Sequence, residues 1–343
     1  ILSLENKESN VFDESTPYAS KNTHDYVMNI LSKSPNFSSI DIQPDIYKNG
    51  SIGQVYRGVY NEKEVIIKVK YEGVDEQTTG DFGIIDMLIK YLYSFNQIEN
   101  AIYDIKDRMM DELNYNIEAS NQHIMKELYK DNDMIIIPEV YPLFSTNNTI
   151  VMEFMEGCQS IKEFISVSTQ NQKNIIGNTL LKFIFENIYK NGLYYSDNHY
   201  GNFLVKDYEK LCVLDFGCLC KFDEVMICNL KDIHRALYAE NKELFFETLE
   251  RAGILSPEIS NESRQYCYDF FKLQYEPIIR PDFVITDEWV DQAGQKDTEL
   301  MKEWNLPRNF IYLHKIPYGL YHILGKLDLQ VNCGEYIFKT YID

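Results

Sequence analysis

The chain has 343 residues, which is enough for two lobes with a sizeable core, and its 45% hydrophobic and 25% charged content is ordinary for a globular protein. The net charge of −20 argues against nucleic acid or an anionic membrane surface as the main partner, because both require a basic patch. No stretch reaches the roughly 18 uncharged apolar residues of a membrane span, so no transmembrane segment is predicted.

The first predicted elements are one short helix and a small set of strands. Residues 1–43 read as an N-terminal extension with a helix near 26–31, ended by the Ser-Pro pair at 34–35. Residues 44–70 alternate apolar and polar positions around two turns, which predicts three strands. Glycines at 50 and 53 would let the backbone approach a phosphate closely.

Two lysines end the third predicted strand. Lys68 is our candidate to hold the α- and β-phosphates of a nucleotide, and Lys70 competes with it because it lies on the same face of the strand. The alternative is that both are edge-strand lysines that limit aggregation.

Residues 81–130 are predicted to be helical, with apolar stretches at 84–92 and 102–113 and the second helix continuing to 121. A phosphate-binding lysine needs an anionic partner, usually a glutamate of a neighbouring helix. Glu112 and Glu118 are the candidates. They would lie about 120° apart around one helix, so only one could face the lysine. The alternative for each is a solvated helix face.

Two further strands are expected at 134–137 and 149–155. The second leads into Met-Glu-Phe-Met-Glu-Gly, which is similar to a hinge that bonds adenine through backbone groups of Glu153 and Met155, with Met152 at the back of the pocket. By itself it would be only a buried edge strand with a turn. Residues 158–193 should then be helical and stop at Gly192.

The clearest chemical signal is the sequence YSDNHYGN at 195–202, followed by an apolar strand and Asp-Phe-Gly at 215–217. In protein-kinase-like sites an Asp in this place lies beside the attacking group, which assigns Asp197. Asn202 and Asp215 supply the oxygen ligands that Mg²⁺ prefers. A second Asp-Phe-Gly begins at Asp81, but it lacks the preceding strand, and we expect a solvated residue at a helix start.

The rest of the chain is predicted to be mainly helical, with an acidic loop at 282–298 and a final apolar helical patch at 310–327. We expect that patch to be core; a docking or membrane-surface face is the alternative. Between Gly217 and Phe246 there is no Ser or Thr, whereas kinases that act on peptides usually carry a phosphorylatable loop here. This argues against a protein substrate.

The seven cysteines include no CxxC pair, and the three around the Asp-Phe-Gly strand lack zinc spacing. We therefore expect small buried thiols in an intracellular, reducing compartment. No signal peptide or arginine-rich transit segment is recognisable.

Together these segments resemble the UbiB family of atypical kinase-like proteins, which is linked to ubiquinone and other isoprenoid lipids. The resemblance covers about residues 44–330. Residues 51–55 look like the end of the family's alanine-rich loop, 112–121 are similar to its ExD helix, 195–202 match its HxDxHPGN loop, and 308–315 resemble a late segment more loosely.

The chain departs from the family pattern at several positions. Asn114 replaces the Asp of ExD, Tyr195 and Tyr200 replace the first His and the Pro of the loop, and residues 48–50 replace the alanines. The KxGQ segment that covers the family's active site is not found, and we expect it upstream of Ile1. Gly50 could make the loop grip phosphate as in ordinary kinases.

The resemblance implies an α+β, two-lobed protein-kinase-like fold with a small antiparallel-sheet N-lobe at 44–155 and a helical C-lobe at 156–343. It implies an ATP- and Mg²⁺-dependent kinase or ATPase acting on a lipid or small molecule, with peripheral membrane contact as an option. The alternatives are a protein kinase without the inhibitory cover and a non-catalytic nucleotide-binding scaffold. The implied nucleotide-binding residues are Ser51, Ile52, Gly53, Gln54, Val55, Lys68, Met152, Glu153 and Met155.

Overall fold

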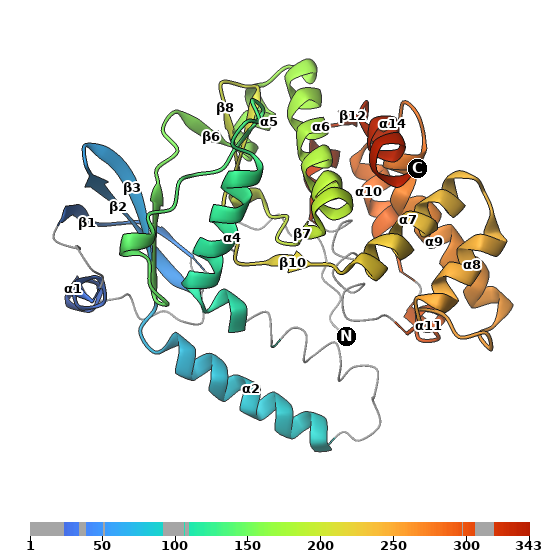
Figure 1. Ribbon diagram of the computed structural model, residues 1–343, viewed down its shortest axis with the longest axis horizontal. Coiled ribbons are helices and arrows are strands. Elements are labelled where there is room, and N and C mark those ends of the chain that lie inside the picture. Colours follow the sequence, from blue (N-terminus) through green and yellow to red (C-terminus); the bar gives the residue numbers. More distant parts are fainter. Residues whose placement is uncertain are drawn as a thin grey trace. The chain divides into compact units, whose positions relative to one another are not determined.

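The computed structural model describes residues 24–33, 39–50, 52–91, 106, 110–296, 298–305 and 319–343. The fold is kinase-like and α+β, with an antiparallel sheet early in the chain and mostly helices later (Figure 1). The described residues fall into two compact units. The first contains those up to Tyr91, 106–123 and 138–154; the second contains 124–137 and those from Met155 onward.

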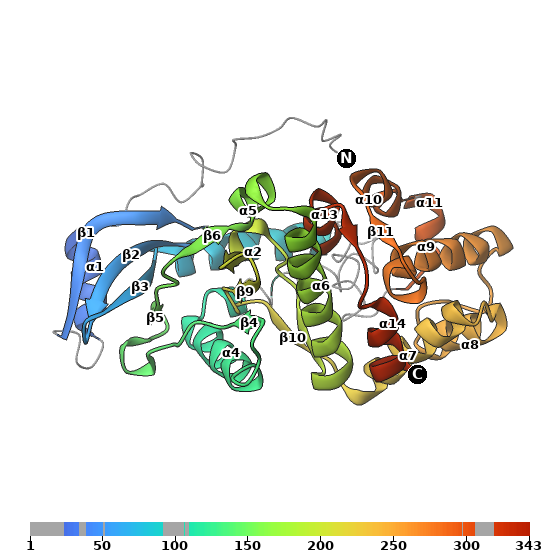
Figure 2. The same ribbon diagram turned by 90° about the horizontal axis from the view of Figure 1, so that it is seen from above.

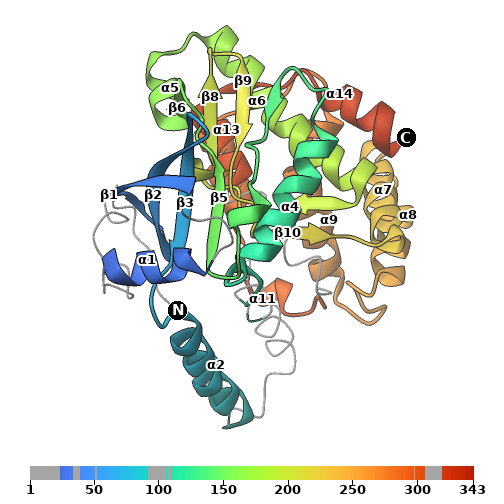
Figure 3. The ribbon, with the colours of Figure 1, turned by 60° about the vertical axis from the view of Figure 1, so that its left-hand side comes forward.

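The first unit is built on a four-stranded antiparallel sheet in the order β1-β2-β3-β5, seen side by side in Figure 3. Its strands are β1 (Ile40–Asn49), β2 (Gly53–Tyr60), β3 (Lys63–Lys70) and β5 (Thr149–Glu153). The strands predicted within 44–70 are therefore confirmed, and the first begins earlier than expected. The helices of this unit are α1 (His24–Ser32), α2 (Val74–Tyr91), the first half of α4 (Tyr115–Leu128) and a 3₁₀ turn (Pro142–Phe144).

Strand alternation divides the sheet into two faces. Val65 and Ile67 of β3 pack with Val27 and Leu31 of α1 in one fully buried cluster. Ile66 lies on the opposite face and packs with Tyr115 at the start of α4. Because side chains two apart on a strand share a face, Lys68 is directed to the same side as Ile66, toward α4.

The prediction of one unbroken helix from 102 to 121 is wrong within the described residues. Leu113 and Asn114 are not helical, and α4 begins at Tyr115. The Asn114 side chain accepts a hydrogen bond from Asn116 N, and its carbonyl accepts from Ile117 and Glu118 N. The first backbone N–H groups of a helix have no hydrogen-bond partner within the helix. Asn114 accepts hydrogen bonds from these groups at the start of α4, a role that Asn performs well. Glu112 and Glu118 consequently lie on different helical segments.

The second unit contains small sheets in the orders β4-β9-β8-β6, β10-β7 and β11-β12. The parallel pairing of β4 with β9 explains why residues 124–137 belong to this unit. The strands are β4 (Ile135–Ile136), β6 (Cys158–Ser160), β7 (Leu193–Tyr195), β8 (Phe203–Lys206), β9 (Lys210–Val213), β10 (Leu219–Lys221), β11 (Val284–Ile285) and β12 (Leu329–Gln330).

Helices surround these sheets, and α7, α8 and α9 lie together in Figure 2. They share a core rich in Phe, Tyr, Leu and Ile. The helices are α5 (Ile161–Val167), α6 (Gln170–Glu186), a π-helical turn (Asn187–Asn191), a 3₁₀ turn (Tyr200–Asn202), α7 (Glu224–Tyr238), α8 (Lys242–Arg251), α9 (Asn261–Ile279), α10 (Asp287–Gly294), α11 (Thr298–Met301), α13 (Leu320–Lys326), α14 (Gly334–Ile337) and a second π-helical turn (Phe338–Ile342).

Several local predictions can be compared with these elements. Gly192 ends its helical segment with a φ of 63°, as expected of a left-handed glycine stop. The acidic stretch at 282–298 is not a loop, because Thr286 caps α10 and Trp289 and Val290 bury their side chains. Asp81 is exposed, but within α2 rather than at its start.

The final apolar patch is core in its described part. Leu320, Tyr321, Ile323 and Leu324 of α13 are all buried, so they present no apolar docking face. Residues 306–318, including the loosely family-like segment at 308–315, lie outside the described residues. Of the helices described, none combines the length and apolarity that crossing a bilayer would require.

Candidate active site

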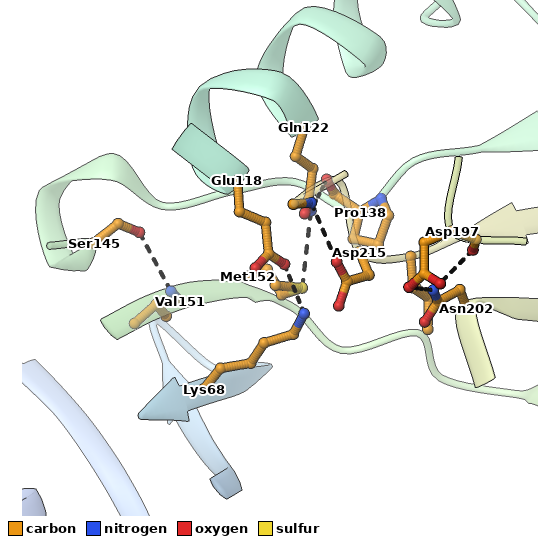
Figure 4. A network of polar contacts seen from close by, with 12 residues as sticks. Lys68, Glu118, Gln122, Pro138, Ser145, Val151, Met152, Asp197, Asn202 and Asp215 are labelled. Atoms are coloured by element: carbon orange, nitrogen blue, oxygen red, sulfur yellow. Dashed lines mark hydrogen bonds and ion pairs between the residues drawn. The ribbon is translucent and has the colours of Figure 1, made fainter. Parts of the chain in front are cut away.

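The first unit contains a buried ion pair between β3 and α4. Lys68 Nζ lies 2.6 Å from Glu118 Oε1, and both residues are labelled in Figure 4. The Glu118 side chain is only 5% exposed and that of Lys68 18%. An ionised carboxylate at this depth requires a cation, and a lysine held this way projects its ammonium in one fixed direction.

Lys70, the competing lysine, has a different set of contacts. Its Nζ donates to Asp75 Oδ1 and Oδ2 at 2.7 and 2.8 Å and to the carbonyl of Leu113 at 2.5 Å. The Lys70 side chain is 2% exposed. These bonds fix the start of α2 and the end of the helical segment before α4, so Lys70 has a structural role in this unit.

The turn between β1 and β2 is tightly packed. A Cβ on Gly53 would lie 2.5 Å from the Val69 carbonyl oxygen and 2.9 Å from the Tyr115 hydroxyl, so close strand packing explains this glycine. The buried Gln54 donates to Asn49 Oδ1 and accepts from Tyr56, within the sheet itself. Ser51 lies outside the described residues.

The remaining turn residues and the predicted adenine edge are placed on strands. Val55 pairs with Lys68 across β2 and β3, and the half-buried Ile52 packs against Tyr115. Met152 on β5 is buried, and its sulfur lies 3.8 Å from Gln122 Nε2. The Glu153 N–H donates to the Glu139 carbonyl, so an adenine bond at Glu153 would use its carbonyl oxygen.

Met155 begins the second unit, where it is half-buried. It directly follows Phe154, the last residue of the first unit.

The second unit holds Asp197 and Asn202 in one compact loop after β7. Asn202 Nδ2 donates to Asp197 Oδ2 at 2.6 Å and to the Asp197 carbonyl at 3.1 Å, and Figure 4 labels this pair. His199 Nδ1 accepts from Gly201 N at 3.1 Å and caps the 3₁₀ turn. Asp197 and His199 are solvent-exposed, whereas Asn198 is buried. The loop therefore fixes its backbone while leaving the Asp197 carboxylate accessible.

Asp215 follows β9 in a strained conformation. Its φ of 59° is left-handed, which is uncommon for a residue other than glycine. Asp tolerates this better than most residues, and here Asp215 Oδ1 accepts from Gly217 N at 3.2 Å. Such strain persists where the surroundings enforce it, and it is often found at functional sites.

Three contacts tie the Asp197 loop to the Asp215 strand inside this unit. Leu214 N donates to the Asn202 carbonyl at 2.8 Å, and the Tyr195 hydroxyl donates to the Leu214 carbonyl at 2.7 Å. The Tyr195 ring also meets Phe216 edge-on at 5.6 Å. Tyr195 is the residue that stands in place of the family's histidine, and it supplies both a polar and an aromatic link.

The donor set suits Mg²⁺. Asn202 commits its amide nitrogen to Asp197, so its carbonyl oxygen is the atom of this side chain that could bind a cation. Asp215 adds a carboxylate. No cluster of three or more His, Cys, Asp or Glu suitable for a metal occurs among the described residues, but Mg²⁺ needs only one or two protein ligands beside phosphates and waters.

Two contributors were not anticipated from sequence. Asp75 neutralises Lys70, yet an Asp at the start of a helix is too common to signal that role. The Tyr195 hydroxyl bond to Leu214 depends on how the β7 and β9 segments approach each other, which residue spacing does not reveal.

Comparison with known proteins identifies the family and the fold. A family model described as the ABC1 atypical kinase-like domain matches residues 12–249. The Saccharomyces cerevisiae protein "Atypical kinase COQ8, mitochondrial" is 26% identical over 304 residues, covering 84% of this chain and 59% of the relative. The Arabidopsis thaliana "Protein ACTIVITY OF BC1 COMPLEX KINASE 3, chloroplastic" is 29% identical over 202 residues, covering 57% of this chain and 28% of the relative.

A solved structure of Rv3197 from Mycobacterium tuberculosis, titled as its complex with erythromycin, superposes with a TM-score of 0.75 at 22% identity. It covers 95% of this chain and 85% of that one, which is a likeness of fold. The chain thus spans less than two thirds of the length of the two curated relatives described above. Since the family model covers well over half of the sequence, the chain belongs to the family of ABC1 atypical kinase-like proteins, as its resemblance to the UbiB family predicted.

Proposed function

We propose that this protein binds ATP with Mg²⁺ and transfers the terminal phosphoryl group to water or to a lipid or small-molecule acceptor. The observation that carries the proposal is the buried Lys68–Glu118 ion pair. A lysine fixed in this way can hold phosphates, and the buried Glu118 carboxylate of α4 gives its ammonium a fixed direction. The names of the relatives, which include "atypical kinase", support the same activity.

Each proposed role follows from the chemistry of the group. Lys68 holds the α- and β-phosphates, and Glu118 fixes its direction. Asn202 and Asp215 hold Mg²⁺, which when bound neutralises negative charge on the phosphate oxygens. Asp197 accepts a hydrogen bond from the attacking hydroxyl or water and aligns it. Residues 52–55 and the backbone at Glu153 and Met155 bind the rest of the nucleotide. Most of the rate enhancement then comes from positioning and charge neutralisation.

The segment after Asp215 favours an acceptor that is not a peptide. Only six residues, 218–223, separate Gly217 from α7, and three of them form β10. This length leaves little room for a loop that could present an extended peptide. We therefore place the protein in a lipid or isoprenoid-quinone pathway, where a peripheral contact with a membrane would bring the acceptor to the site. The proposal includes a reducing intracellular compartment, because the cysteines of the sequence form neither a CxxC pair nor a zinc-binding pattern.

The experiment is ATP hydrolysis by the purified chain with Mg²⁺ and with EDTA, measured alone and with phospholipid vesicles. We expect Mg²⁺-dependent release of phosphate that the Asp197→Asn variant loses. Mg²⁺-independent hydrolysis of equal rate, or full activity in Asp197→Asn, would contradict the proposal.

A protein kinase is the second candidate, because a Dictyostelium discoideum relative is named "Probable serine/threonine-protein kinase abkB". Incorporation of labelled phosphate into added proteins by the wild type, absent in Asp197→Asn, would favour it. MgATP binding without turnover under any of these conditions would instead indicate a nucleotide-binding scaffold.

A further inference from the structure

The catalytic loop of the second unit touches a segment near the end of the chain. Gly319, directly before α13, packs against Asn198, the residue next to Asp197. A Cβ on Gly319 would lie 2.6 Å from the Asn198 carbonyl oxygen and 2.8 Å from its Cβ. Both are closer than real Cβ contacts come, and neither atom can move by a side-chain rotation. Any residue larger than glycine must therefore displace the loop backbone or α13.

A second contact is made by Tyr200, three residues after Asp197 in the same loop. The Tyr200 hydroxyl donates to the His322 carbonyl at 3.4 Å, and the two rings meet edge-on at 5.7 Å. Tyr200 stands where the UbiB pattern has proline, which could not make this bond.

The segment that meets the loop is itself firmly held. Tyr321 donates a hydrogen bond to the Gln274 carbonyl of α9 at 2.7 Å, and its ring packs on Trp289 of α10. Lys326 pairs with Asp287 at 2.7 Å. α13 is therefore a rigid support for the catalytic loop, because its side chains are fixed to both α9 and α10.

We propose that Gly319 and Tyr200 are positioning residues for phosphoryl transfer, which clamp the loop segment directly after Asp197 onto α13. The inference rests on the proposed function, because Asp197 is given its role there. It extends that function to residues 319–322, which lie beyond the region matched by the family model. A displacement of about 1 Å in a catalytic group is enough to lower a rate by as much as ~100-fold.

The test compares Gly319→Ala with Gly325→Ala. Gly325 lies near the other end of α13, and its Cβ would meet Val290 Cγ2 at 2.9 Å and Asp287 Oδ1 at 3.1 Å, which are side-chain atoms of α10 and not part of the catalytic loop. We expect Gly319→Ala to lower kcat for ATP by at least ~10-fold with KM within about twofold, since nucleotide binding does not depend on Asp197. Gly325→Ala should keep the wild-type kcat and lose less thermal stability, because the side-chain atoms that its Cβ would meet can shift.

Hydrogen–deuterium exchange of a peptide covering 196–203 gives a readout that needs no turnover. Exchange there should be at least ~10-fold faster in Gly319→Ala and unchanged in Gly325→Ala. Tyr200→Phe removes one hydroxyl without adding bulk, so it is the alternative variant if Gly319→Ala does not fold. It should also lower kcat and speed exchange in this peptide, but by smaller factors.

The outcomes separate the two proposals. Unchanged exchange in Gly319→Ala overturns the clamp whether or not the enzyme is active. Faster exchange with an unchanged kcat overturns its role in positioning. Faster exchange in a protein whose wild type never turns over ATP supports the clamp and removes the proposed function.

Discussion

The ammonium of Lys68 meets the carboxylate of Glu118 on the α4 face of the first sheet, at 2.6 Å and almost out of contact with solvent. Glu118→Gln keeps the shape of the side chain and removes its charge. We expect MgATP turnover to fall by roughly 10–100-fold, because the lysine loses the group that directs it. Steady-state hydrolysis assays on wild type and variant provide the measurement.

The matched control is Glu64→Gln, which breaks the partly exposed Arg57–Glu64 pair of the same sheet. Such pairs contribute less than about 1 kcal/mol, and this one is not assigned to the nucleotide. Turnover should stay within about twofold of wild type. Equal losses in both variants would mean that Glu118 acts only through the stability of the sheet.

Asp197 and Asn202 are bonded to each other, but their proposed tasks differ. Asp197→Asn removes the carboxylate that aligns the attacking group and leaves the Mg²⁺ ligands in place. We expect kcat to fall by about 10²–10⁴-fold while the Kd for MgATP changes less than about threefold. Single-turnover kinetics together with calorimetric titration separate the two quantities. A large loss of affinity with an unaltered kcat would reverse the assignment.

Gly50 and Gly53 respond differently to an added methyl group. Among the described residues, a Cβ on Gly50 would meet only the Gly53 carbonyl oxygen, at 3.2 Å, so Gly50→Ala should fold normally. If Gly50 lets the turn grip phosphate, Gly50→Ala should weaken ATP binding several-fold. An unchanged Kd would show that the turn does not grip phosphate in this way.

Gly53→Ala is the contrasting variant, since its Cβ would collide with the Val69 carbonyl at 2.5 Å. It should lower the Tm clearly, whether or not ATP is bound. Comparing the two variants by thermal unfolding and ATP titration distinguishes an effect on the ligand from an effect on the sheet.

The sequence was most informative where local pattern decides structure. The alternation around Lys68 correctly placed β3, and the motifs at 195–202 and 215–217 indicated the family that the family model confirms. Prediction from the sequence failed where a capping residue, rather than the spacing of apolar residues, decides where a helix begins. Asn114 breaks the helix expected at 102–121, and Thr286 starts a helix inside an acidic stretch that read as a loop.

Long-range contacts could not be predicted at all. The pairing of β4 with β9 joins residues more than 70 positions apart, and the Gly319–Asn198 contact joins residues more than 100 apart. Nothing in either local segment specifies its partner. Tyr195 could be identified as a departure from the family pattern, but its bond to Leu214 required the fold.

His234 makes stability depend on pH in the acidic range. It is fully buried on α7, its Nδ1 lies 2.6 Å from the Tyr189 hydroxyl, and burial lowers its pKa to about 3. The unfolded chain binds a proton near pH 6.5, whereas the folded chain does not until about pH 3. Stability from this group is therefore full above pH 6.5 and is lost as the pH falls, by up to about 1.4 kcal/mol per pH unit.

Denaturant unfolding at pH 7 and pH 5 provides the test. His234 should contribute a loss of roughly 2 kcal/mol between these two values, which the non-titrating His234→Gln variant lacks. The comparison is between the pH slopes of the two proteins, since the substitution also changes overall stability. Identical slopes would mean that the pKa of His234 is the same in the folded and the unfolded protein.

Asp215 gives the most direct test of the central claim, that this chain holds ATP through Mg²⁺. Asn adopts the left-handed φ of 59° about as readily as Asp, so Asp215→Asn changes the charge and spares the fold. The measurement is calorimetric titration of ATP into wild type and Asp215→Asn, each with Mg²⁺ and with EDTA. We predict that wild type binds at least ~10-fold more tightly with Mg²⁺ and that the variant loses this difference. Mg²⁺-dependent binding of equal strength in Asp215→Asn would contradict the account.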